Sequence, residues 1–183
     1  MTRPAPTLTL RHHAAAETLT LRDEIVPVYA AAHHDLMSDP WFHPDRFWER
    51  LVDLYAPGRD FGLATGWLDN QVVGYAFGSP RDDEGRLWDT VRSQLPDLPL
   101  TGTVYIFREF AVHPDHQRHG YGRQIHDALL DTRPEPVAHL LVRPDNAPAQ
   151  HAYAAWGWTK IGTVQPFADS PTFDALALRL PQF

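Results

Sequence analysis

The residue types best suited to chemistry lie in the run Gln117-Arg118-His119-Gly120-Tyr121-Gly122-Arg123. Its two glycines are separated by one residue and stand where a helix is expected to begin, so main-chain N–H groups can converge there without Cβ atoms in the way. The unpaired donors of a first helical turn and the positive end of the helix dipole both favour a bound anion. We therefore predict that the main chain of residues 118–123 binds a phosphate or diphosphate, with Arg118 and Arg123 adding positive charge.

The spacing of the glycines narrows the kind of site. A dinucleotide-binding loop needs a third glycine at position 125, where this sequence has Ile125. A P-loop needs Gly-Lys-Ser/Thr, which is absent here. Ile125 therefore argues against a nucleotide-dependent dehydrogenase.

A second group of residues follows the next expected strand: Asn146, then Ala149, Tyr153 and Gly157-Trp158. An asparagine just beyond a strand end offers both a donor and an acceptor to an amide-bearing ligand. Ala149 and Tyr153 are four residues apart and should share one face of a helix, where the small Ala149 leaves room for a ligand beside the tyrosine.

Glu109 is a carboxylate in an otherwise apolar strand, where it is costly unless it is solvated or paired. By the two-residue period of a strand it should share a face with Ala111 and His113. It is a candidate general base, and the alternative is a structural pair with Arg108 or with a base on a neighbouring strand. His113 is a rival base because an unperturbed imidazole titrates near neutral pH.

The remaining histidines do not predict a metal site. Those at every third position surround a turn broken by proline and need not face one point, and adjacent histidines point apart in either regular structure. We assign no function to the adjacent pairs. The regularly spaced residues are His113, His116 and His119, and the adjacent pairs are His12-His13 and His33-His34.

The elements that must position these residues alternate between strand and helix. The connection at 79–101 shows no convincing strand, although Leu87, Trp88, Val91 and Leu95 fit a short helix. Strands are predicted at 7–11, 61–68, 71–78, 103–113, 137–142, 158–164 and 173–180, with Asp69-Asn70 as a hairpin turn. Helices are predicted at 14–34 with an interruption near Pro27, from Pro44 to Tyr55, at 120–131, and at 147–156 before Gly157. The step from 103 to 142 predicts a parallel strand pair, and its flanking hairpins predict a mixed sheet.

Composition bounds the class of protein. The 183 residues suit a single domain over 1–183 with a substantial core. A formal charge of −7 argues against a broad nucleic-acid-binding face. There is no apolar run long enough for a membrane span and no apolar segment of a secretion signal, so no membrane partner is expected. The absence of cysteine excludes disulfides and thiol nucleophiles, and we expect a cytoplasmic protein.

The strand ending in Ala111-Val112-His113-Pro114, followed by Gln117-Arg118-x-x-Gly120-x-Gly122, resembles the acyl-CoA signature of the GNAT superfamily of N-acetyltransferases. The pattern Asn146-x-x-Ala149-x-x-x-Tyr153-x-x-x-Gly157-Trp158 is similar to the C-terminal half of many members. The resemblance implies an α/β fold with about seven strands and about four helices. In it, the two central parallel strands splay apart and admit the pantetheine arm of the cofactor.

The resemblance also implies roles. Acetyl-CoA would be the acyl donor, an unidentified primary amine the acceptor, and transfer would be direct, without a metal. A homodimer through the last strands is plausible by analogy. Trp41 and Phe42 could wall the acceptor site, and the acidic residues of 79–101 could attract a cationic amine. The cofactor-binding residues would be Ala111 and Val112 for pantetheine, Gln117, Arg118, His119, Gly120, Tyr121, Gly122 and Arg123 for the diphosphate, and Asn146 and Ala149 beside the arm.

Two functions remain open from the sequence. In the first, an N-acetyltransferase, Tyr153 protonates the departing thiolate, Glu109 is the base, and the N–H of Val112 is the candidate to stabilise the developing oxyanion. In the second, a non-catalytic acyl-CoA-binding or sensor domain, the same loop binds the cofactor without turnover. The presence of candidates for both acid and base favours the enzyme.

Overall fold

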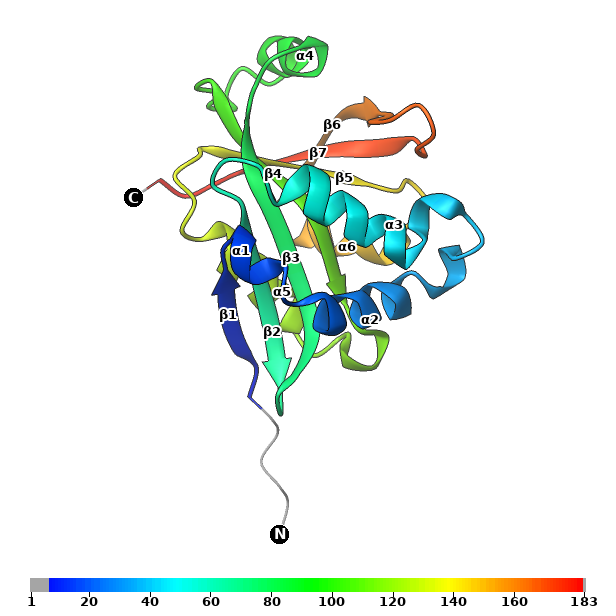
Figure 1. The fold of residues 1–183 in the computed structure, drawn as a ribbon. Helices are drawn as coiled ribbons and strands as arrows, with labels where there is room; N and C mark the ends of the chain where they lie inside the picture. Colours follow the sequence, from blue (N-terminus) through cyan, green and yellow to red (C-terminus); the bar gives the residue numbers. More distant parts are fainter. Residues whose placement is uncertain (1–6, 183) are drawn as a thin grey trace. The chain divides into compact units, whose positions relative to one another are not determined.

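The computed structural model describes residues 7–182. The chain divides into two compact units, and β3 (Gln71–Asp82) and β4 (Thr103–Val112) run through both. The first unit comprises the residues up to Phe77 together with Glu109–Leu129. The second comprises Gly78–Arg108 and the residues from Leu130 onward. Figure 1 shows the elements of both units.

The sheet is mixed, as predicted. Its strand order is β1-β2-β3-β4-β5-β7-β6, with β4 and β5 parallel and β1–β2, β5–β7 and β6–β7 antiparallel. The remaining strands are β1 (Thr9–His13), β2 (Gly62–Leu68), β5 (Val137–Val142), β6 (Thr159–Val164) and β7 (Phe173–Arg179). The helices are α1 (Ala15–Thr18), α2 (Arg22–Ala32), α3 (Pro44–Arg50), α4 (Arg86–Gln94), α5 (Tyr121–Leu130) and α6 (Ala147–Ala155). Shorter turns are η1 (His34–Leu36), η2 (Pro40–Phe42), η4 (Pro114–His116) and the π-helical η3 (Leu51–Tyr55).

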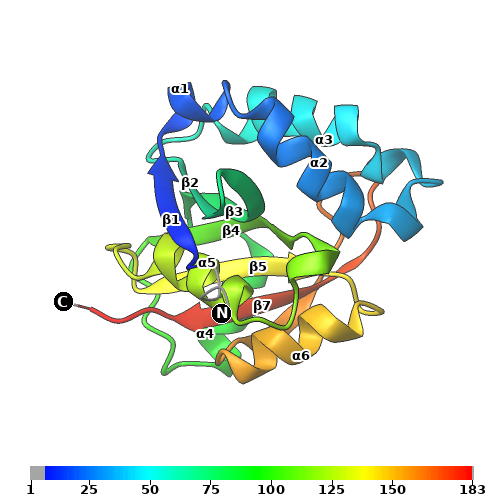
Figure 2. The ribbon, with the colours of Figure 1, turned by 90° about the horizontal axis from the view of Figure 1, so that it is seen from below.

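In the first unit, helices cover both faces of the strands (Figure 2). Tyr75 of β3 packs with Tyr29 of α2 and Phe47 of α3 in one buried cluster. Its neighbour Gly74 points the other way, because successive residues of a strand face opposite sides. A Cβ atom on Gly74 would lie 2.7 Å from Cδ1 of Ile125, so α5 packs closely on that second face.

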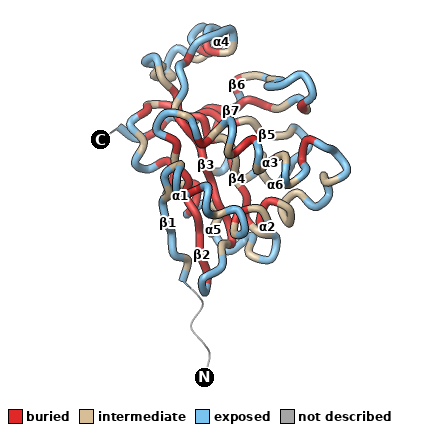
Figure 3. The backbone as a smooth tube through the Cα atoms, in the orientation of Figure 1, coloured by how far each residue is buried: buried red, intermediate tan, exposed pale blue. Residues whose placement is uncertain are grey.

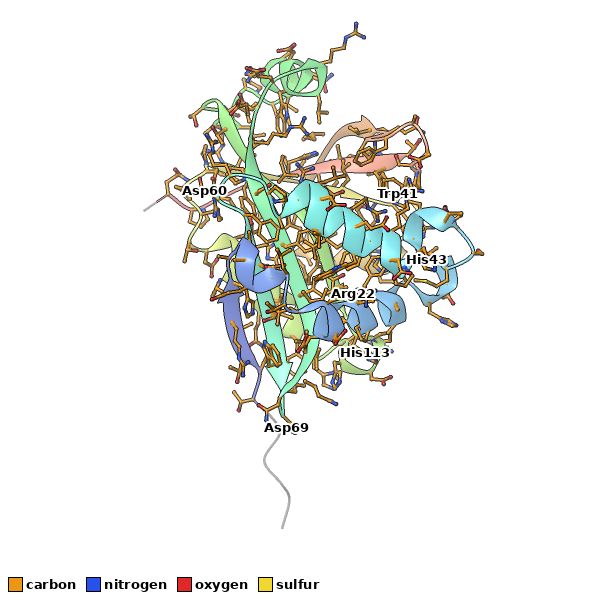
Figure 4. The ribbon with its side chains drawn as sticks, viewed as in Figure 1. Arg22, Trp41, His43, Asp60, Asp69 and His113 are labelled. Carbon is orange, nitrogen blue, oxygen red and sulfur yellow. The ribbon has the colours of Figure 1, made fainter. Side chains whose placement is uncertain are left out.

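The turn between β2 and β3 confirms the predicted hairpin. Asp69 and Asn70 have φ angles of 45° and 69°. Positive φ at both central residues is the type I′ geometry that suits the right-handed twist of paired strands. Figure 4 shows Asp69 at the tip of this hairpin, and Figure 3 shows that the strands leading to it are largely buried.

The predicted interruption of the first helical segment at Pro27 is wrong. Pro27 lies inside α2, and the break falls instead at residues 19–21, between α1 and α2. There the Thr20 hydroxyl donates to the carbonyl of Glu17 at 2.7 Å, a local bond that competes with helix continuation. Burial of Ile25 and Tyr29 on either side of Pro27 holds α2 together despite the lost donor.

The second unit is also layered on both faces of its strands. Trp88 and Val91 of α4 pack in a cluster with Ile106 of β4. The next residue, Phe107, contacts the ring of Tyr153 of α6 at 6.5 Å between centroids. Since successive strand residues face opposite sides, α4 and α6 cover opposite faces of β4. The helix predicted from Leu87, Trp88 and Val91 is thereby confirmed as α4.

The prediction that the connection at 79–101 holds no strand is wrong for its first residues, since β3 continues to Asp82. The continuation depends on β4. The N–H of Asp83 donates to the carbonyl of Gly102 at 3.1 Å, and a Cβ atom on Gly78 would lie only 2.2 Å from the carbonyl oxygen of Ile106. This close backbone approach joins residues far apart in the sequence. Because Pro80 argues against a strand, the sequence alone does not predict that β3 continues there.

Within residues 7–182, no helix has the length and apolar character required to cross a membrane.

Candidate functional site

The predicted anion-binding loop opens α5 in the first unit. Arg118 and Gly120 both have left-handed φ angles, of 63° and 78°. Left-handed residues within a turn direct successive N–H groups toward one concavity, which is an anion-binding arrangement. The first main-chain bond of the helix runs from the N–H of Gln124 to the carbonyl of Gly120 at 3.3 Å. The amides before Gln124 precede the helical bonding pattern and are suited to a ligand.

The loop is anchored through its own polar groups. The Gln117 side chain donates to the carbonyl of Val112 at 3.0 Å. His119 Nδ1 lies 2.7 Å from the carbonyl of Gln117, and its ring stacks on Tyr121 at 5.6 Å. Arg123 Nε donates to Asp127 at 2.6 Å. Gln117, His119 and Tyr121 thus shape the loop, and Asp127 offsets part of the positive charge that Arg123 was expected to supply.

The end of β4 presents its main chain in two directions. The N–H of His113 donates to the carbonyl of Val73 on β3 at 2.8 Å. Because alternate residues of a strand direct their N–H and C=O groups to opposite edges, those of Val112 point away from β3. The Ala111 carbonyl faces β3, since a Cβ atom on Gly74 would lie 2.9 Å from it. The N–H of Val112 is therefore the better placed group for pairing with an extended ligand, because the Val112 carbonyl already accepts the Gln117 side chain.

Glu109 lies on β4 beside α2. Its Oε1 is 3.9 Å from Nε2 of His33, and its side chain is 23% exposed. Ala111, two residues further along the strand, belongs to the buried cluster with α2 and α3, as the predicted common face requires. The C-cap histidine of α2 is thus a neighbour of Glu109.

Burial raises the pKa of Glu109 above its ordinary value, while the charges of His33 and Arg50 act against that rise. The hydroxyl of Tyr75 is buried and has no hydrogen-bond partner among residues 7–182. Burial, followed by the charge of Glu109, raises the pKa of Tyr75, which therefore stays neutral at physiological pH. The carboxylate and this hydroxyl are polar groups in an aromatic surrounding, an arrangement that marks a candidate functional site.

Arg50 supplies the fixed positive charge of this region. Its side chain is buried, donates to the carbonyl of Trp41 at 3.0 Å and lies 4.3 Å above the Trp41 ring. Trp41 and Phe42 are both buried at η2, and Figure 4 shows Trp41 close to the start of α3. These contacts hold the guanidinium in place, so its effect on Glu109 is a permanent one.

Tyr153 lies in the second unit within a group of aromatic rings. Its ring meets those of Phe107, Trp156 and Trp158 edge to face, at 6.5, 5.8 and 5.9 Å between centroids. The residue is only 6% exposed. These contacts fix the ring, which is a requirement for a positioned acid and equally for a packing residue.

Asn146 and Ala149 lie at the start of α6. Asn146 is the N-cap, and its Oδ1 accepts the N–H of Ala149 at 3.2 Å. That bond occupies one of the two lone pairs of the asparagine carbonyl oxygen. The role predicted for Asn146 toward a ligand stays a prediction.

Other candidate residues have structural partners. Asp83, expected to attract a cationic amine, is buried, and its carboxylate accepts the N–H of Gly102 at 3.1 Å and pairs with Arg92 at 2.9 Å. Within the described part of the chain, no three His, Cys, Asp or Glu side chains form a group that could hold a metal.

Sequence reasoning missed His33 and Arg50. His33 was given no role because it precedes His34, and adjacent residues point apart. The useful signal was its spacing of four from Tyr29, since His33 caps α2 and its ring stacks on that of Tyr29. Nothing in the sequence indicated that Arg50 is buried near Glu109, because an arginine at a helix end is usually solvated.

The layered mixed sheet, the loop at the start of α5 and the parallel strands are features of an acetyltransferase fold. The profile of the acetyltransferase (GNAT) family matches residues 21–158. This chain belongs to that family.

Solved structures share the fold at low sequence identity. A protein of Pyrococcus horikoshii OT3 matches with a TM-score of 0.66 at 17% identity, covering 94% of this chain and 98% of that one. The ribosomal-protein-S18-alanine N-acetyltransferase of Escherichia coli matches with 0.59 at 18%, covering 94% of each. The PaiA N-acetyltransferase of Thermoplasma acidophilum, in complex with coenzyme A, matches with 0.57 at 8%, covering 94% and 99%. No curated protein matches this sequence.

Proposed function

We propose that this acetyltransferase moves an acetyl group from acetyl-CoA to a primary amine of a small molecule or peptide, by direct attack in a ternary complex. The observation that carries the proposal is Glu109, a carboxylate whose pKa is raised by burial and which lies 3.9 Å from His33. A base poised closer to neutral pH is suited to deprotonating an amine. The solved N-acetyltransferases of similar fold support amine chemistry as the class of reaction.

The loop at the start of α5 supports acetyl-CoA as the acyl donor. Its left-handed residues Arg118 and Gly120 and the first-turn amides suit a diphosphate. The main chain of Val112, directed away from β3, suits the amide-bearing pantetheine arm and supports the predicted oxyanion donor. The residues present thus fit coenzyme A, and the acetyl thioester would supply the electrophilic carbonyl.

The proposed reaction conserves protons. The amine nitrogen forms a bond to the thioester carbonyl carbon and passes one proton to the carboxylate of Glu109. The C–S bond then breaks, its electron pair goes to sulfur, and the hydroxyl of Tyr153 donates a proton to that sulfur. Glu109 returns its proton to solvent and Tyr153 takes one back, so the products are the amide and CoA thiol.

Substitution of Tyr153 by phenylalanine tests the enzyme against a non-catalytic acyl-CoA-binding domain. The ring contacts with Phe107 and Trp158 are retained in Tyr153→Phe, so the fold and the CoA affinity should be unchanged. Loss of a general acid should lower kcat by about 10²-fold. CoA thiol release over a panel of amines measures kcat, and calorimetry measures affinity. Tight CoA binding by the wild type with no thiol release for any amine would favour the binding domain.

A further inference from the structure

His33 is held in a fixed plane beside Glu109. Its ring stacks on Tyr29 at 4.1 Å between centroids and 25° between planes, and on Phe42 at 5.9 Å and 21°. Its side chain is only 18% exposed. Stacking on both residues restricts rotation of the imidazole, so the nitrogen that meets Glu109 is set by the packing.

The hydrogen bond on the other side of the ring fixes the tautomer. Nδ1 of His33 lies 2.9 Å from the carbonyl oxygen of Tyr29. A carbonyl oxygen only accepts, so Nδ1 must carry a proton. In the neutral ring Nε2 then carries only a lone pair, and it carries a proton only in the imidazolium form. Nε2 is the atom 3.9 Å from Oε1 of Glu109.

The groups facing the carboxylate come from three other elements. Tyr29 is on α2 and His33 is the C-cap residue of that helix, Arg50 is on α3, and Tyr75 is on β3. Arg50 keeps its charge at all relevant pH values, and burial raises the pKa of both tyrosines so that they remain neutral. His33 is therefore the neighbour of Glu109 that has both a neutral and a charged form available, according to whether Nε2 carries a proton.

We propose that His33 is a positioning residue that sets the protonation state of Glu109 through Nε2. With an imidazolium, Nε2–H pairs with the carboxylate and keeps Glu109 ionised as a base. With a neutral ring, a lone pair faces the carboxylate, whose affinity for a proton increases.

This inference rests on the proposed function, in which Glu109 accepts the proton of the attacking amine. The N–C bond forms and the C–S bond breaks as described above, and His33 exchanges no covalent bond other than its own N–H. His33 keeps the Glu109 carboxylate ionised at pH values at which, without the imidazolium, the carboxyl group would already be protonated.

Carbon-13 spectroscopy of the Glu109 carboxyl carbon tests the pair directly. The resonance is assigned by its loss in Glu109→Gln and followed from acid to alkaline pH. In His33→Ala the carboxyl should titrate at higher pH than in the wild type, because the imidazolium that favours the anion is absent. His33→Gln, which retains a polar side chain of similar reach, should move the titration in the same direction if the alanine variant folds poorly. An unchanged titration in a folded His33 variant overturns the proposal.

Kinetics provide the second measurement, with His34→Ala as a matched control because His34 is adjacent and exposed. On the acid limb, kcat/KM of His33→Ala should fall about tenfold and approach the wild-type value as the pH rises. An equal loss at all pH values would indicate a packing role and contradict the proposal. The two measurements distinguish a failure of the proposed acetyltransferase reaction from a failure of the proposed role of His33. A shifted carboxyl titration without thiol release would refute the acetyltransferase reaction, and thiol release with an unshifted titration would refute the role of His33.

Discussion

Replacement of Glu109 by glutamine should stabilise the protein while abolishing most of its activity. Glutamine keeps the shape of the side chain and removes the charge. Because burial raises the pKa of Glu109 above its ordinary value of 4.5, the folded state binds a proton more tightly than the unfolded chain. That contribution to stability is fully present below pH 4.5 and is lost as the pH rises through the folded pKa.

The magnitude follows from the linkage relation. One proton bound in the folded state and absent in the unfolded state changes stability by at most about 1.4 kcal/mol per pH unit. Between pH 4.5 and the folded pKa of Glu109, the wild type should lose stability relative to Glu109→Gln with a slope up to that limit. Outside this window the difference should be constant. The charges of His33 and Arg50 narrow this window, since both oppose the rise in pKa that burial causes.

Urea denaturation of both proteins across a pH series measures the difference. The variant should also lose about 10²- to 10⁴-fold in kcat/KM, the usual contribution of a general base. A stability difference that does not change with pH, or a variant that becomes relatively less stable as the pH rises, would refute the argument that burial destabilises the ionised carboxylate.

Further predictions concern the backbone of each unit. Gly120→Ala places a side chain at a φ of 78° and should cost about 1–2 kcal/mol of strain, weakening CoA binding measured by calorimetry. Gly85→Ala is its control, because Gly85 has a φ of 99° and equally open surroundings outside the loop, so it should lower the melting temperature without affecting CoA binding. Gly74→Ala should destabilise by about 1–3 kcal/mol in urea denaturation, because its Cβ would lie 2.7 Å from Ile125 Cδ1 and 2.9 Å from a backbone oxygen. Asn146→Ala removes the cap of α6 and should cost about 1 kcal/mol by the same assay, with Asn146→Asp retaining most of the stability.

Much of the fold could be predicted where local chemistry decides it. The strand at 137–142 has the predicted bounds, and Pro44 begins a helix as its fixed φ and missing donor require. Gly157, predicted to end α6, has a φ of 94°. These positions depend on the conformational preference of one or two residues, which can be predicted from the residue types alone.

The errors occur where distant contacts override local preference. Pro27 does not break α2 because buried neighbours hold the helix, and β3 passes Pro80 because it is paired with β4. The candidate site shows the same division. The loop at 117–123 could be predicted from glycine spacing, whereas the contact between His33 and Glu109 joins a helix and a strand far apart in the sequence. Residue patterns along one element do not contain that information.

The anion-binding role of the loop is the claim on which the function most depends. Amide proton–nitrogen spectra recorded during titration with desulfo-CoA test it directly, because each N–H of residues 118–123 reports its own hydrogen bonding. We predict that these amides show the largest downfield proton shifts in the protein and that the shifts saturate with added ligand. Unmoved loop amides, while other residues respond to the same ligand, would contradict the account.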